Sequence, residues 1–108
     1  MIYIKINDTL IPAEISGFMT DRAWDNRESK AITVEMDHAT AAATFVDELP
    51  WAIVMDVETE DGIVQEEYDN SEFSVAGSIT DNRDGTVTIK MGKPTAEERL
   101  AELMEVLA

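Results

Sequence analysis

The sequence predicts an α+β domain, mainly antiparallel β, in which six or seven strands form a small barrel or roll with a short internal helix and a C-terminal helix. Apolar and polar residues alternate along much of the chain, which is the period of half-buried strands. Turn-forming residues separate these segments. At 108 residues without cysteine, the chain suits a single domain that folds without disulfides. We expect a β-rich body over residues 1–92 and the C-terminal helix over residues 95–108.

The clearest hairpin is predicted over residues 72–91. Inward-facing positions alternate on both arms, namely Phe73, Val75, Gly77 and Ile79 on the first and Val87, Ile89 and Met91 on the second. A three-residue loop over residues 83–85, with Gly85 at positive φ, places Ile79 opposite Ile89. A loop that is one residue shorter or longer would shift the pairing by one, so that the apolar side chains of the two arms would lie on opposite faces of the sheet.

Two strands are predicted at the start of the chain, over residues 1–7 and 10–15. A tight turn joins them and sets Ile11 opposite Ile4. Pro12 has no amide donor, which favours an edge position.

The next segment, residues 16–29, has no clear period and is expected to be an irregular connection. Its aromatic residues and its charges of both signs suit contact with another chain, because Trp and Arg contribute strongly to interfaces. The alternative is that Trp24 covers the core of its own domain while the charges are solvated. The candidate interface residues are Phe18, Arg22, Trp24, Arg27 and Lys30.

The middle of the chain continues the β pattern around one short helix. A strand over residues 30–36 precedes a helix over residues 38–46, for which Asp37 is the N-cap. The strand over residues 51–57 is apolar on both faces and is expected to be central. It turns at residues 61–62 and sets Tyr68 opposite Met55. The expected core residues are Trp51, Ile53, Met55, Val75, Ile79, Val87 and Ile89.

The C-terminal helix begins with a capping box, in which the Thr95 hydroxyl and the Glu98 carboxylate each accept from the other's backbone amide. Leu100, Leu103, Met104 and Leu107 then recur at helical spacing. We expect this apolar stripe to pack on the chain's own domain, with a neighbouring chain as the alternative.

The charge distribution excludes several functions. The chain carries 23 acidic against 8 basic residues, a net charge of −15. No Lys or Arg occurs over residues 31–82, which hold thirteen Asp and Glu. Phosphate backbones and anionic membranes attract cationic surfaces, so we expect no direct nucleic-acid or membrane binding. The acidity either solvates the surface or faces a basic partner.

Few residues could act in catalysis or bind a metal ion. His38 is the single histidine, and no nucleophile or base at a useful spacing accompanies it. The acidic run over residues 56–67 has partial calcium-loop spacing, but its glycine comes one position late and its flanks are strands. We therefore expect no catalytic residue, no cofactor and no bound metal, and hence no enzyme.

Four stretches, residues 27–33, 45–47, 68–77 and 79–95, resemble small uncharacterised proteins encoded in the structural (tail) gene region of prophages from Gram-positive gut bacteria. The resemblance implies a virion structural or tail-assembly role through protein–protein contacts, with self-association. An alternative is an acidic phage-encoded inhibitor or DNA mimic that binds a basic host protein. No signal peptide or membrane-spanning run is evident, so the host cytoplasm or the virion is the expected location.

Overall fold

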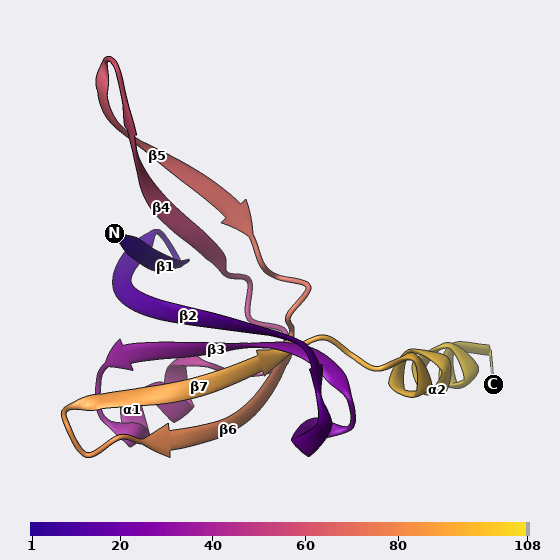
Figure 1. The fold of residues 1–108 in the computed structure, drawn as a ribbon. Coiled ribbons are helices and arrows are strands. Elements are labelled where there is room, and N and C mark those ends of the chain that lie inside the picture. The colour runs from indigo at the N-terminus through magenta and orange to yellow at the C-terminus, as the bar shows by residue number, and fades with distance from the viewer. Residues whose placement is uncertain (108) are drawn as a thin grey trace.

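The computed structural model describes residues 1–107, and within them seven antiparallel strands and two helices confirm the predicted class (Figure 1). The strands are β1 (Ile2–Ile6), β2 (Thr9–Asp21), β3 (Arg27–Glu35), β4 (Ala52–Thr59), β5 (Gly62–Asp69), β6 (Val75–Asp81) and β7 (Thr86–Gly92), and the helices are α1 (His38–Thr44) and α2 (Ala96–Leu107). The sheet order is β5-β4-β1-β2-β3-β7-β6. Across the described residues the two end strands do not pair with each other, so the sheet is open and barrel-like only in a loose sense.

The long strand β2 joins the two halves of the sheet. Its first residues pair with β1, up to Tyr3 opposite Pro12, and its pairing with β3 starts at Ala13 opposite Val34. The expectation that Pro12 lies on an edge strand is wrong for the strand as a whole, because β2 is internal. Pro12 nevertheless precedes the first β2–β3 pair, so its missing amide interrupts no pairing with β3.

Residues 16–29 are not an irregular connection. β2 continues to Asp21, a single 3₁₀ turn spans Arg22–Trp24, and β3 starts at Arg27. Residues 16–20 of β2 are all exposed, so no alternation of apolar and polar side chains could reveal the strand. Backbone pairing with β3, which is more buried, makes this segment regular.

The core lies between the sheet and α1, which packs against β6 and β7. Trp51, Val87 and Ile89 are buried as predicted, and Ile53, Val75 and Ile79 are half-buried. Met55 is exposed instead. Met55 shares a face of β4 with Ile53, which packs against the core opposite Ile4, whereas Ala52 and Val54 are buried on the other face. Met55 also lies opposite Ile2, where β1 begins, so the rest of β4 extends beyond the end of β1 (Figure 1).

Two of the three predicted registers are confirmed, Ile4 opposite Ile11 and Ile79 opposite Ile89. In the β4–β5 hairpin, Tyr68 lies opposite Ile53 rather than Met55. The loop is Glu60-Asp61, and Gly62 has a φ of +116° after it instead of forming the turn. The shift is two residues, which leaves each side chain on the face where the alternation placed it.

Both helix starts are confirmed. The Asp37 carboxylate accepts from the Thr40 amide at 2.6 Å, and Thr95 and Glu98 form the reciprocal capping box, with N–O distances of 2.8 and 3.2 Å. α1 ends two residues early, because Phe45 leaves the helical conformation and enters the core. Residue 108, which we placed in the C-terminal helix, lies outside the described residues. Among residues 1–107 no helix is long and apolar enough to cross a membrane.

The turn between β6 and β7 gives a first testable prediction. Gly85 has a φ of +89° and no neighbouring atom within 4 Å of a Cβ built there, so only backbone strain opposes substitution. Gly85→Val should lower the free energy of unfolding by about 1–3 kcal/mol. Gly17→Val is the control, since Gly17 has equal space and ordinary backbone angles. Thermal unfolding of Gly85→Val at the parent's midpoint would contradict the assignment.

Candidate protein-interaction surfaces

The end of the β2–β3 hairpin folds back onto the sheet through Trp24. A Cβ at Gly77 of β6 would lie 2.5 Å from the Trp24 ring, and one at Gly92 of β7 would lie 2.9 Å from it. The indole therefore occupies space that only glycine leaves free on these two strands. Trp24 is half-buried against its own domain, which is the intramolecular alternative considered from the sequence.

Arg27, at the start of β3, is the most buried charge of this region, with 3% of its side chain exposed. Its guanidinium donates to both carboxylate oxygens of Glu98, at 2.9 and 3.2 Å, and to the Lys93 carbonyl at 3.0 Å. The guanidinium carbon also lies 4.6 Å from the Trp24 ring centroid. A bidentate pair with a stacked aromatic ring is the geometry in which a buried guanidinium is best compensated.

Glu98 connects this cluster to α2. Its hydrogen bond from Arg27, followed by that from the Thr95 amide, lowers the pKa of the carboxyl to about 2. One side chain thus completes the capping box and binds Arg27. Since about half of Glu98 is exposed, water screens part of this interaction.

A second polar cluster holds the same hairpin to β7. Lys90 lies 2.8 Å from the Asp21 carboxylate, which also accepts from the Ser29 hydroxyl at 3.3 Å. The hydrogen bond from Lys90 lowers the pKa of Asp21. Asp21 and Ser29 are buried, so this end of the hairpin is a well-connected part of the fold.

The five candidate interface residues have different environments. Trp24 and Arg27 contact each other, and Lys30 points inward, with its ammonium 4.6 Å from the Phe73 ring centroid and a hydrogen bond to Asn70. Burial lowers the pKa of Lys30. Phe18 is 42% exposed and Arg22 is exposed. Of the five candidate residues, Phe18 and Arg22 therefore have the most side-chain surface available to another chain.

The stripe of α2 does not pack on its own domain, contrary to the first expectation. Leu100, Leu103 and Met104 are 57, 56 and 62% exposed, and the side chain of Leu107 lies outside the described part of the helix. α2 projects from the end of β7 away from the sheet (Figure 1). The sequence pattern did not reveal that this stripe is exposed, because helical spacing identifies an apolar face but not what that face contacts.

The β4–β5 hairpin is a second projecting element (Figure 1). Every residue of β5 is exposed, and Ile63, Val64 and Tyr68 present apolar surface at 68, 46 and 50% exposure. Its acidic residues are Asp56, Glu58, Glu60, Asp61, Glu66, Glu67 and Asp69. Among the residues described, no three His, Cys, Asp or Glu side chains are grouped so as to hold a metal ion.

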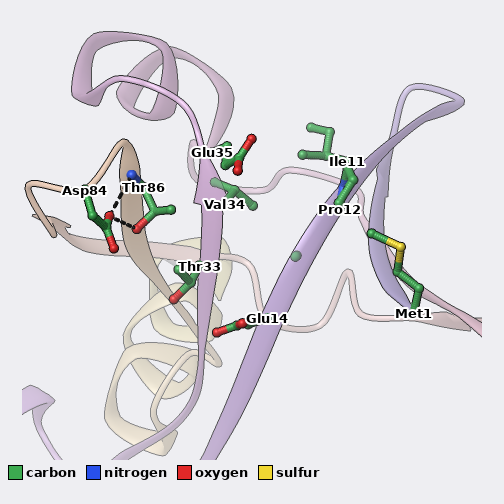
Figure 2. Close-up of a pocket in the computed structure, with 10 residues that line it drawn as sticks. Met1, Ile11, Pro12, Glu14, Thr33, Val34, Glu35, Asp84 and Thr86 are labelled. Atoms are coloured by element: carbon green, nitrogen blue, oxygen red, sulfur yellow. Dashed lines mark hydrogen bonds between the residues drawn. The ribbon is translucent and has the colours of Figure 1, made fainter.

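A hollow of about 590 Å³ lies between the first half of β2 and the end of β3, bordered by the β6–β7 turn. Figure 2 shows the side chains that line it. Its lining combines apolar with acidic and hydroxyl side chains, namely Met1, Ile11, Pro12, Ala13, Val34, Glu14, Glu35, Asp84, Thr33 and Thr86. The hydrogen bond from the Thr86 hydroxyl, followed by that from the Thr86 amide, lowers the pKa of the Asp84 carboxyl. This carboxylate is therefore occupied in shaping the turn.

Comparison with known proteins does not identify a relative. No protein-family model, curated protein or solved structure matches this chain. The function must therefore be inferred from the exposed surfaces and from the sequence pattern.

The packing of Trp24 against Gly77 gives a second testable prediction. Gly77→Ala should force the indole to move, and overpacking of this kind typically costs about 1–3 kcal/mol. The measurement is the NMR shift of the Trp24 indole N–H together with the midpoint of thermal unfolding. Gly17→Ala, where a Cβ meets nothing within 4 Å, should change neither. An unchanged Trp24 signal in Gly77→Ala would disprove the packing described here.

The Arg27–Glu98 pair gives a third prediction, on pH. Because the pKa of Glu98 falls from 4.5 to about 2, its stabilising contribution is complete above pH 4.5 and is lost as the pH falls toward 2. The Trp24 and Arg27 side-chain NMR signals should follow this loss. Glu98→Gln at neutral pH should resemble the acidified parent, whereas Glu102→Gln should not. A Glu98 titration near pH 4.5 would contradict the pairing.

Proposed function

We propose that this protein is a non-catalytic structural or assembly protein of a phage particle, a tail component that acts through contacts with other proteins. The observation that supports this best is α2, which presents Leu100, Leu103 and Met104 to solvent from a helix that leaves its own domain. Such a stripe on a projecting helix is typical of a segment that becomes buried against another chain.

The arrangement of the projecting elements also favours assembly. The β4–β5 hairpin and α2 extend from different parts of the sheet, in different directions (Figure 1). A subunit with two unlike contact surfaces can bind different neighbours, and head-to-tail contacts of that kind generate rings or filaments. Both forms suit the phage tail that the sequence resemblance implies.

Self-association would use the end of the β2–β3 hairpin. Phe18 and Met19 are 42 and 84% exposed there, and Arg22 adds an exposed positive charge. The cation-free segment over residues 31–82 of an identical neighbour offers complementary charge. Trp24 and Arg27 would hold this surface in place rather than contact the neighbour, because Arg27 stacks on Trp24 and binds Glu98 of the same chain.

The acidic inhibitor remains the second candidate, and the β4–β5 hairpin is the observation that favours it. Seven carboxylates and no cation lie on an exposed, projecting hairpin, which suits the basic site of a DNA-binding protein. A monomer that competes with DNA for such a protein would support this candidate over assembly.

A fourth prediction tests the self-association. Light scattering of the parent should show an apparent mass that rises with protein concentration and falls as salt is added, since screening acts within about 10 Å at 0.1 M salt. Phe18→Ser with Arg22→Ser should shift the apparent mass toward that of the monomer without unfolding the domain. Leu10→Ser, which removes an exposed apolar side chain outside both of these surfaces, is the control. A parent that is monomeric at every concentration and salt level would refute self-assembly.

A further inference from the structure

We propose that one face of the β4–β5 hairpin is the surface on which the end of the β2–β3 hairpin of a second copy docks. This inference rests on the proposed self-association, and it assigns the surface of the neighbour that Phe18 and Arg22 contact. The register of the hairpin, the exposure of its side chains and their charges each support it.

The register of the β4–β5 hairpin gathers apolar side chains on one face. Residues directly opposite each other share a face of a sheet, and so do residues two apart along a strand. Ile53 packs against the core, so its face of the hairpin continues the core side of the sheet. This surface, which we call the hairpin face, consists of Ile53, Met55, Val57, Val64, Glu66 and Tyr68.

The outer part of the hairpin face is uncovered in the single chain. Met55, Val64 and Tyr68 are 36, 46 and 50% exposed. The helix α1 lies on the core side of the sheet but packs against β6 and β7, at the other end of the sheet order (Figure 1). An apolar sheet face is normally buried against another layer, so the hairpin face suits contact with another chain.

The hairpin face combines apolar surface with negative charge. Glu66 is its one charged residue, and the hairpin as a whole carries seven carboxylates and no Lys or Arg. The Tyr68 hydroxyl donates to the Glu66 carboxylate. A carboxylate has about four lone-pair sites, so Glu66 can accept from a guanidinium without losing this hydrogen bond.

The end of the β2–β3 hairpin combines apolar surface with positive charge. Within residues 17–24, Asp21 and Arg22 are the only charged residues, and Asp21 is paired with Lys90 at 2.8 Å. Arg22 is exposed, and the Lys90 ammonium lies 5.8 Å from the centroid of the exposed Phe18 ring. Opposite charge beside apolar surface on both sides favours contact between the β2–β3 end and the hairpin face.

The α2 stripe is the other exposed apolar surface of this chain, and its charges give it no such preference. At 3.6 residues per turn the stripe is flanked by one acid, Glu97, and one base, Arg99. Of the two surfaces, only the β2–β3 end is therefore matched in sign to the acidic hairpin. The resulting contact joins two different surfaces, so it is head-to-tail, and every chain offers one of each.

The fifth prediction is a charge exchange between Arg22 and Glu66. Arg22→Glu alone and Glu66→Arg alone should each weaken self-association at least tenfold, because each places like charges in the contact. The measurement is analytical ultracentrifugation at about 0.15 M salt. The double variant Arg22→Glu/Glu66→Arg restores opposite charges and should associate within about threefold of the parent. A double variant as weak as the single variants would overturn the pairing.

A matched control separates this contact from general charge attraction. Glu58 is exposed on the same hairpin, but the register places it on the opposite face. Glu58→Arg makes the same change in charge as Glu66→Arg and should leave self-association within about threefold of the parent. Equal weakening by the two substitutions would show that only the net charge of the hairpin matters, which contradicts docking on the hairpin face.

Mixing two variants tests the head-to-tail geometry. Phe18→Ser with Arg22→Ser removes the β2–β3 end, and Met55→Ser with Val64→Ser removes the hairpin face. Each variant alone should be monomeric, whereas an equimolar mixture should form a 1:1 dimer, since one intact copy of each surface remains. Circular dichroism verifies that both variants are folded. A mixture that stays monomeric would contradict the contact.

Two further results would also overturn the inference. If Leu100→Gln with Leu103→Gln and Met104→Gln abolishes the oligomer while Arg22→Glu does not, the α2 stripe makes the contact instead. If Phe18→Ser with Arg22→Ser lowers the apparent mass but Met55→Ser with Val64→Ser does not, the hairpin face is not the receiving surface. In that last case this inference fails while the proposed self-association stands.

Discussion

The burial of Arg27 is the constraint on which the arrangement of the exposed surfaces depends. Removing a charged side chain from water costs several kcal/mol unless it is paired and hydrogen-bonded. The compensation comes from the Glu98 carboxylate, the Lys93 carbonyl and the Trp24 ring, which belong to separate segments of the chain. Arg27 therefore ties the start of α2 and the hairpin turn to β3. The outward direction of the α2 stripe follows from this one side chain.

The two edges of the open sheet are poor sites for another strand, which leaves α2 as the more accessible apolar surface. Edge strands attract further strands unless charge or a covering segment prevents it. β5 carries Glu66, Glu67 and Asp69, and pairing it with its own copy would bring carboxylates together. On β6 the Ala76 amide already donates to the Asp47 carboxylate at 2.8 Å, and the register shifts between Ala76 and Ile79.

Local sequence signals predicted most elements and three of the six strand pairings, β1–β2, β4–β5 and β6–β7. They did not predict the pairings β1–β4, β2–β3 and β3–β7, and contacts distant in sequence decided the surfaces. Turn chemistry and alternation were enough for the β6–β7 register, and side-chain capping for both helix starts. The outer half of β2 was missed because both of its faces are exposed. The core-facing side of β4 was predicted correctly, but Met55 is exposed because its partner Ile2 lies where β1 begins. Arg27 was placed at an interface because its partner Glu98 lies 71 residues away.

The acidic residues of this chain have different physical roles at different positions, and the composition alone does not separate these roles. Glu98 is part of the fold, since its carboxylate compensates a buried guanidinium. Glu67 accepts from Lys5 of β1 at 3.0 Å, and Glu66 places charge on the exposed edge strand β5, where charge disfavours pairing with another strand. Glu102 and Glu105 are exposed on α2 and are solvated. A uniform reduction in charge would therefore combine loss of the α2 junction with changes at the sheet edge and on the solvated surface of α2. Only substitutions made one position at a time can separate these effects.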